Sequence, residues 1–238
     1  MRQVMESKLA AMLDSAIARE HQQKPKRSYL GASRLGENCA RKLQYEFMGA
    51  EPDQPFSGKQ LRTFAMGHHL ESLVISWMKD AGFDIITRNK DGQKYSFSVA
   101  NDRIAGHIDG VIVAGPDGFL YPALFECKTL NNKSWKDLEK HGLAVSKPGY
   151  YVQIQLYMAY MQLTEGPALL VALNKDSSEL YFEWVAFDGA VAQKYSDRAV
   201  QILQASEASE LLPRLSQDPN YFECKWCPYH KTCFGGGI

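Results

Sequence analysis

The 238-residue sequence contains no long hydrophobic run and carries no net charge. Its longest apolar stretches, such as residues 168–173, fall far short of the roughly 20 residues needed to cross a bilayer. The N-terminus alternates charged and apolar residues instead of forming the apolar core of a signal peptide. We therefore expect a soluble cytoplasmic protein with no membrane partner.

The lack of net charge also limits how the protein could attract nucleic acid. Lys and Arg together number 27, as do Asp and Glu, so the whole molecule exerts no long-range pull on DNA. Any DNA contact must rely on local basic clusters, such as Lys133, Lys136, Lys140 and Lys147. The sequence shows no helix-turn-helix or other sequence-reading module, which favours DNA binding without sequence specificity.

The hydrophobic pattern alternates between helical and strand-like segments. Helices are predicted at residues 1–21, 33–47, 59–81, 150–163 and 189–206. Strands are predicted at residues 84–88, 94–99, 104–113, 120–129, 168–174 and 180–186, the first four as an antiparallel meander. This order predicts an α/β fold with a central mixed sheet flanked by helices. We expect residues 1–27 to form a helix and linker, followed by one domain over residues 28–238.

Acidic and basic residues recur on two consecutive predicted strands. Side chains alternate between faces along a strand, so Glu126 and Lys128 share one face while Cys127 points into the core. The intervening turn brings Asp109 opposite Glu126. Two such carboxylates suit Mg²⁺ or Mn²⁺ in phosphodiester hydrolysis, and the lysine can orient the attacking water or help to deprotonate it. The spacing alone also fits a solvated surface ion pair.

These residues resemble the PD-(D/E)xK nuclease superfamily in its RecB and lambda-exonuclease branch. Asp109 followed by Glu126-Cys127-Lys128 is similar to the motif that names the superfamily. The resemblance implies a restriction-endonuclease-like core. It also implies that Asp109, Glu126 and the backbone carbonyl of Cys127 bind Mg²⁺ or Mn²⁺, with Lys128 as a catalytic residue.

A helix in this family supplies a further metal ligand, and residues 64–71 resemble it. Glu71 lies four residues after Gly67, which is similar to the lambda-exonuclease arrangement, while His68 and His69 compete for the role. The resemblance therefore implies Glu71 as a metal ligand and leaves the two histidines as alternatives.

Farther along the chain, Gln153 and Tyr157 resemble the Gln-x-x-x-Tyr motif of the same family. Residues four apart share one helix face, so both side chains can reach the same place. The resemblance implies that they support the DNA beside the metal site.

The five cysteines favour metal or redox chemistry over disulfides, because a reducing compartment keeps thiols free. Cys224, Cys227 and Cys233 form a C-x2-C-x5-C run, and Cys39 lies far upstream. Four thiolates suit an iron-sulfur cluster or Zn²⁺, and His230 could replace one thiol at zinc. The arrangement resembles that of CRISPR-associated iron-sulfur exonucleases and AddB-type nucleases. It implies a structural 4Fe-4S cluster on these four cysteines, with Zn²⁺ as the alternative.

The resemblance covers the chain from about Ser33 to Cys233 and implies a hydrolase, namely a metal-dependent DNA exonuclease. It would process single-stranded DNA or free DNA ends in recombination, repair or phage replication, alongside recombination or replication proteins. Two alternatives come from other classes of protein. One is a catalytically inactive DNA-binding or scaffold relative, and the other is a zinc-ribbon interaction protein whose acidic motif is a chance match.

Overall fold

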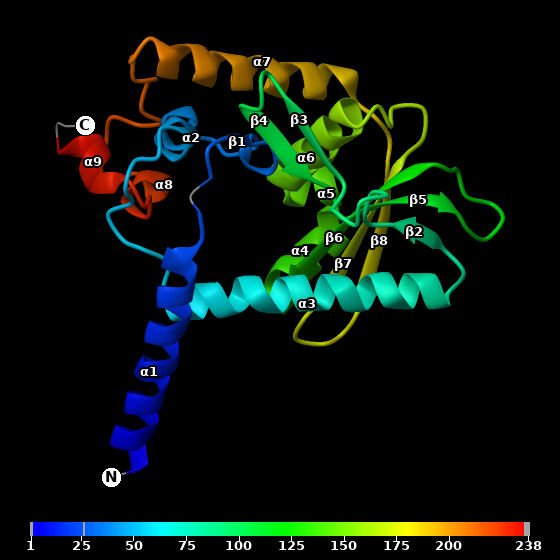
Figure 1. Cartoon of the computed structure of the whole chain (residues 1–238), viewed down its shortest axis with the longest axis horizontal. Helices are drawn as coiled ribbons and strands as arrows, with labels where there is room; N and C mark the ends of the chain where they lie inside the picture. Colours follow the sequence, from blue (N-terminus) through cyan, green and yellow to red (C-terminus); the bar gives the residue numbers. More distant parts are fainter. Residues whose placement is uncertain (1, 26, 236–238) are drawn as a thin grey trace.

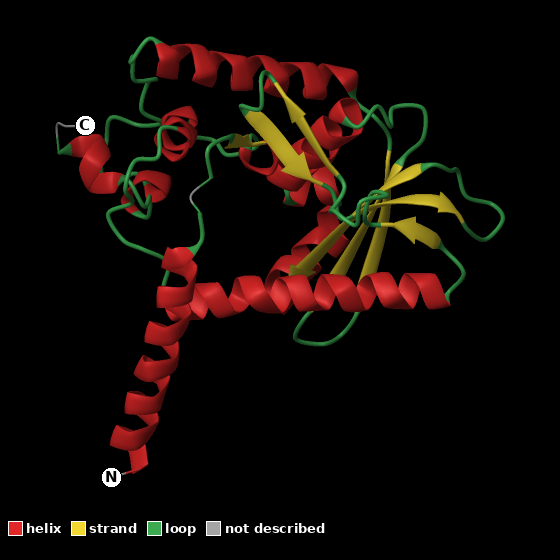
Figure 2. Ribbon diagram, in the orientation of Figure 1, coloured by secondary structure: helices red, strands yellow, loops and turns green. Residues whose placement is uncertain are grey.

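The computed structural model describes residues 2–25 and 27–235, and it contains two β-sheets (Figure 2). The larger sheet has the order β2-β5-β6-β7-β8, with β2 (Asp84–Ile86), β5 (Gly110–Ala114), β6 (Ala123–Leu130), β7 (Ala168–Asn174) and β8 (Leu180–Val185). The smaller sheet has the order β1-β4-β3, with β1 (Leu30–Gly31), β4 (Ile104–His107) and β3 (Ser96–Val99). In the larger sheet only the β6–β7 pair is parallel, so the predicted mixed sheet is confirmed.

Helices flank the larger sheet (Figure 1). In chain order they are α1 (Arg2–Gln23), the 3-10 helix η1 (Ala32–Arg34), α2 (Ala40–Phe47), α3 (Gly58–Asp80), α4 (Asn132–His141), α5 (Leu143–Ser146), α6 (Pro148–Tyr160), α7 (Gly189–Glu207), α8 (Phe222–Lys225) and α9 (His230–Phe234). Figure 1 shows α1 projecting away from the rest of the protein. Among the described residues, no helix is long and apolar enough to cross a membrane.

The central part of the larger sheet, around β6, is covered on both faces. On one face, Val74 of α3 belongs to a cluster with Phe125 of β6. On the other face, Ile154 of α6 belongs to a cluster with Leu124 of β6. Because side chains alternate along β6, its even-numbered residues point to the α6 side. This alternation places Glu126 and Lys128 on the α6 side of the sheet and Cys127 on the α3 side.

The start and end of α3 are fixed by local sequence. The Ser57 side chain accepts a hydrogen bond from the backbone N–H of Gln60, and the Gln60 side chain accepts one from the backbone N–H of Ser57. This reciprocal capping satisfies two backbone donors that the first turn would otherwise leave free. The helix ends before Gly82, whose φ of 94° suits glycine.

The predicted antiparallel meander is wrong in two respects. Its first strand, β2, pairs with β5 and not with the next strand, β3, and the single strand expected at residues 104–113 is two strands in different sheets. The backbone N–H of Ile108 donates to Tyr95 O over 3.0 Å, which keeps the first half beside the smaller sheet. Gly110 instead pairs with Phe125 in the larger sheet. Asp109 lies between the two halves, and not late in a continuous strand as the sequence suggested.

One helical prediction needs correction, and one helix was not predicted. The helix expected over residues 33–47 begins only at Ala40, with Cys39 in the N-cap position and η1 before it. The sequence analysis placed no helix between the strand at residues 120–129 and the helix at residues 150–163, where the structure contains α4, whose N-cap Asn131 side chain accepts from the backbone N–H of Ser134. The remaining predicted helices and the strands at residues 168–174 and 180–186 are confirmed within a few residues at their ends.

Candidate active site

The register of β5 against β6 brings Asp109 beside Glu126, as the sequence predicted. The backbone N–H of Cys127 donates to Asp109 Oδ2 over 2.9 Å, which fixes the carboxylate at the edge of β6. Lys128 shares a face with Glu126, and its Nζ lies 2.5 Å from Glu126 Oε1. The expected pair of carboxylates and the ammonium therefore meet at one place.

The carboxylate of Glu126 is deeply buried, with only 1% of the residue exposed. Its Oε1 accepts from Lys128 Nζ and from Gln153 Nε2, the latter over 2.6 Å. Its Oε2 is buried and has no hydrogen-bond partner among the described residues. Such an oxygen destabilises the fold unless a donor or a cation reaches it. Glu126 Oε2 therefore marks a position suited to a bound cation.

Helix α3 contributes Glu71, whereas both neighbouring histidines remain at the surface. The Glu71 side chain is 15% exposed and lies 3.1 Å from Lys94 Nζ. The His68 side chain is 78% exposed, with its Nδ1 3.8 Å from Glu71 Oε2, and His69 is exposed. Of the three competing residues, Glu71 is the one that the protein holds in a mostly buried position.

Burial and neighbouring charges shift the pKa values at this site. Burial raises the pKa of Asp109 well above its usual value, and the charges of Glu126 and Glu71 raise it further. Burial by itself lowers the pKa of Lys128, but the charges of Glu126 and Asp109 outweigh this effect and raise it. The carboxylates repel one another when ionised, and a divalent cation among them would relieve that repulsion.

Removing one carboxylate charge should stabilise the metal-free protein. Because the folded-state pKa of Asp109 is raised, its contribution to stability is present at low pH and is lost as pH rises above the usual carboxyl value of 3.8. We expect Asp109→Asn to raise the melting temperature in EDTA, by about 2–4 °C per kcal/mol of repulsion relieved, with a difference that grows with pH. Thermal melts of both proteins in EDTA, from acidic to neutral pH, measure this difference in melting temperature. An Asp109→Asn variant that melts below wild type at neutral pH would contradict the repulsion among the carboxylates.

Gln153 and Tyr157 lie on α6 but occupy different surroundings. Gln153 reaches Glu126 directly and is itself mostly buried. Tyr157 is 3% exposed, its ring centroid lies 5.4 Å from that of Phe97, and its hydroxyl is hydrogen-bonded to Ser33. Burial raises the pKa of Tyr157. Gln153 is thus part of the carboxylate cluster, whereas Tyr157 is packed behind it.

Two further side chains hold the charged groups in place. The ring of Tyr150 lies under Lys128, with 4.9 Å between the ring centroid and Nζ, a favourable cation–π geometry. Lys94 approaches Glu71 from the segment before β3. The sequence analysis missed Lys94, because a lone lysine 23 residues from its partner leaves no pattern.

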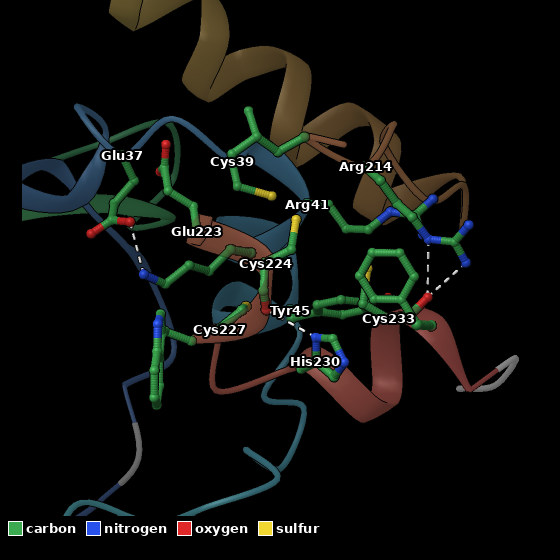
Figure 3. A pocket seen from close by; sticks show the side chains of 14 residues that line it. Glu37, Cys39, Arg41, Tyr45, Arg214, Glu223, Cys224, Cys227, His230 and Cys233 are labelled. Carbon is green, nitrogen blue, oxygen red and sulfur yellow. Dashed lines mark hydrogen bonds and ion pairs between the residues drawn. The ribbon is translucent and has the colours of Figure 1, made fainter. Parts of the chain in front are cut away.

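The four cysteines expected to bind a cluster line a single cavity of about 140 Å³ (Figure 3). Figure 3 shows the sulfur atoms of Cys39 and Cys224 pointing toward one another. Burial raises the pKa of both the Cys224 and the Cys227 thiols, and the charges of Cys39 and Cys233 contribute to the rise. Within the described residues, no three His, Cys, Asp or Glu side chains are arranged so that they could together hold a metal ion.

Polar contacts attach the C-terminal cysteine segment to the body of the protein. The Asp53 carboxylate accepts from the backbone N–H of Lys231, and the Arg214 guanidinium donates to the Cys233 carbonyl over 2.7 Å. His230 Nδ1 lies 2.9 Å from the Cys224 carbonyl oxygen, so this nitrogen is already engaged. The segment is therefore held in position by interactions that do not depend on the thiols.

Cys127 is separate from this cavity. It is 6% exposed and packs in the cluster on the α3 side of the sheet, as the alternation of β6 predicted. Burial raises the pKa of its thiol. Cys127 is therefore a core residue whose backbone, and not its thiol, faces the candidate site.

Comparison with known proteins shows similarity at the level of the fold. The sequence matches no protein-family profile and no curated protein. The fold is similar to that of SSO0001, with 17% identity over 97% of this chain and 98% of that chain and a TM-score of 0.50. It is also similar to the alkaline exonuclease LHK-Exo from Laribacter hongkongensis, with 16% identity over 77% of this chain and 90% of that one and a TM-score of 0.51. A structure of LHK-Exo in complex with dAMP gives 15% identity over 84% and 93% of the two chains and a TM-score of 0.52.

Proposed function

We propose that the protein is a metal-dependent deoxyribonuclease that hydrolyses phosphodiester bonds in DNA. The observation that carries this proposal is the unpartnered, buried Oε2 of Glu126 beside Asp109 and Lys128. Neighbouring carboxylates, with an ammonium held beside them, form the donor set that metal-dependent phosphodiester hydrolysis requires. The fold likeness to an alkaline exonuclease agrees with this chemistry.

We propose that these residues bind a hard divalent cation such as Mg²⁺ or Mn²⁺, for which oxygen donors are the preferred ligands. Asp109, Glu126 and Glu71 would hold it with carboxylate oxygens, and the backbone carbonyl of Cys127 would add a fourth oxygen. Because no three such side chains of the described residues surround a common point in the structure, binding requires the carboxylates to move together around the ion. When bound, the ion would lower the pKa of a water molecule and neutralise charge on the reacting phosphate. Its charge would also satisfy the buried Oε2 of Glu126, which has no hydrogen-bond partner in the part of the chain that the structure describes.

The chain's own groups orient the reactants. Lys128 keeps its proton because its pKa is raised, so its Nζ acts as a donor that positions the attacking water or stabilises phosphate charge. Gln153 donates to Glu126 Oε1 and restricts how that carboxylate can rotate. Tyr150 limits the positions open to the Lys128 ammonium through its ring. Lys128 is therefore proposed as an electrostatic group and not as a general base.

We further propose an exonuclease that acts on free DNA ends, single-stranded or double-stranded, in recombination, repair or phage replication. Incubation of the protein with linear DNA and with covalently closed circular DNA tests this specificity. We expect Mg²⁺ or Mn²⁺ to support release of nucleotides from the linear DNA only, and EDTA to stop it. Equal cleavage of the closed circle would show an endonuclease instead.

We propose that Cys39, Cys224, Cys227 and Cys233 bind a 4Fe-4S cluster, with Zn²⁺ as the alternative. The support is that four thiols from opposite ends of the sequence line one cavity of about 140 Å³. A zinc site needs its sulfur ligands close around a single ion, whereas a cluster spreads them around a larger group. When bound, the group would tie the C-terminal segment to α2 and serve the fold, with no role in hydrolysis.

A further inference from the structure

Strand β8 leaves one edge of the larger sheet open among the described residues, because it pairs only with β7. Its side chains alternate, and Leu180, Phe182 and Trp184 are exposed by 38%, 52% and 37%. Their partners across the ladder are Leu173, Val171 and Leu169, which all belong to the cluster on the α3 side. The exposed residues of β8 therefore continue this apolar face of the sheet beyond the part that is covered.

The apolar surface extends from the strand onto the loop between β5 and β6. The ring of Phe119 stacks on that of Trp184, with 5.4 Å between centroids and 26° between planes. The adjacent Leu120 is 70% exposed. We name the five residues Phe119, Leu120, Leu180, Phe182 and Trp184 the β8 patch. Contiguous apolar surfaces of this kind mark sites of interaction with another macromolecule.

The edge of β8 carries few of the features that usually block strand pairing. Its sequence, Leu180–Val185, has no proline and no lysine, and its exposed face has no charged side chain. Its one charged residue, Glu183, points to the opposite face, where its carboxylate accepts from the backbone N–H of Leu143 and from the Tyr181 hydroxyl. The Glu179 carbonyl accepts from the backbone N–H of Asn174 over 2.9 Å, so it points toward β7. In an antiparallel strand the backbone groups alternate, and those of Leu180, Phe182 and Trp184 therefore point outward. They offer donors and acceptors to an additional strand.

We propose that a second copy of this chain occupies the β8 edge, so that two β8 strands pair antiparallel about a two-fold axis at Phe182. In this register Phe182 faces its own equivalent, and Leu180 faces Trp184 of the second copy. On the opposite face, Tyr181 comes opposite Glu183, and its hydroxyl already donates to that carboxylate within one chain at 2.6 Å. The pairing therefore matches apolar with apolar and hydroxyl with carboxylate.

Charge excludes the neighbouring registers. An axis at Glu183 would place two Glu183 carboxylates opposite each other, and an axis at Tyr181 would place Glu183 opposite Glu179. Like charges directly opposite are destabilising in a sheet. A shift that pairs Phe182 with Glu183 would put an apolar residue opposite a charge and divide the β8 patch between the two faces. Strands β6 and β7 lie between β8 and β5, which Asp109 precedes, so the inference stands independently of the proposed nuclease function.

Sedimentation of the full-length protein over a range of concentrations tests the proposal. We expect a concentration-dependent dimer, and we expect Phe182→Glu to raise its dissociation constant by about a hundredfold or more. Phe222→Glu is the matched control, because Phe222 is 75% exposed but lies outside the β8 patch, and it should leave the dimer intact. Circular dichroism confirms that both variants fold. A wild-type protein that stays monomeric, or a Phe182→Glu variant that still dimerises normally, would overturn the proposal.

Oxidative crosslinking tests the register itself. Opposite residues in an antiparallel pair have Cα atoms about 4.5–5.5 Å apart, which is within the range of a disulfide. A Phe182→Cys variant should therefore form a covalent dimer under mild oxidation, above the background that the wild type shows. A Leu180→Cys variant should stay at background, because it faces Trp184 of the second copy. Crosslinking of Leu180→Cys instead of Phe182→Cys would overturn the register.

Discussion

Replacing Lys128 with alanine should reduce metal-dependent DNA hydrolysis by about two to three orders of magnitude, the range observed when a preorganised donor that stabilises transition-state charge is removed. Its Nζ lies 2.5 Å from Glu126 Oε1 and over the ring of Tyr150, so the ammonium is held beside the carboxylates. The rate constant of single-turnover hydrolysis at saturating metal measures this loss for the chemical step, apart from product release. Lys79→Ala, which removes an exposed lysine from the last turn of α3, is the matched control and should retain full activity.

Loss of the Lys128 ammonium also leaves the buried Glu126 carboxylate without its cationic partner, which will reduce stability. A second variant separates folding from activity. Glu126→Gln is neutral and nearly the same shape, so it should fold well and be as inactive as Lys128→Ala. Full hydrolysis by both variants, with normal thermal melting, would contradict the assignment of this cluster as the active site.

If the four cysteines bind the proposed iron-sulfur cluster, replacing Cys39 with alanine should prevent cluster binding and destabilise the whole protein. Cys39 occupies the N-cap position of α2, whereas the other three thiols lie in the C-terminal segment, so the cluster would link regions far apart in sequence. A loss of about 3 kcal/mol or more corresponds to a fall in melting temperature of roughly 6–12 °C for a chain of this size. Iron and sulfide analysis of protein purified without oxygen, together with thermal melts, measures both effects.

Cys127→Ala provides the matched control for that variant, because Cys127 is a buried thiol outside the cavity. It should keep the same iron and sulfide content as wild type while losing some stability through the small void that it leaves. A colourless wild-type protein that contains zinc without sulfide would identify the alternative metal. Normal melting of Cys39→Ala would show that the four cysteines have no shared structural role.

The sequence predicted those parts of the site that depend on short-range geometry. Asp109 and Glu126 lie on either side of one hairpin, so counting residues from the turn was sufficient to pair them. The alternation along β6 likewise placed Lys128 with Glu126 and directed Cys127 into the core. Residues brought together over long distances were identified only through the resemblance to a nuclease family, which is how Glu71 and Gln153 entered the prediction.

Other features depend on packing that no local pattern encodes. The break between β4 and β5 arises because the backbone N–H of Ile108 bonds to Tyr95 while Gly110 joins the larger sheet, and the sequence prediction instead extended one strand through both halves. The unpartnered oxygen of Glu126 results from the way α6 approaches β6, with Gln153 reaching only one of the two carboxylate oxygens. Neither fact could be read from spacing, although the second carries the functional proposal.

The measurement that tests the central claim most directly is the release of labelled nucleotides from end-labelled linear DNA, with wild-type protein and Glu126→Gln compared in Mg²⁺ or Mn²⁺. We predict that wild type releases nucleotides only when the metal is present and that Glu126→Gln releases none. No release by folded wild-type protein with either metal, on single-stranded or double-stranded DNA, would contradict the nuclease assignment and favour a DNA-binding protein without catalytic activity.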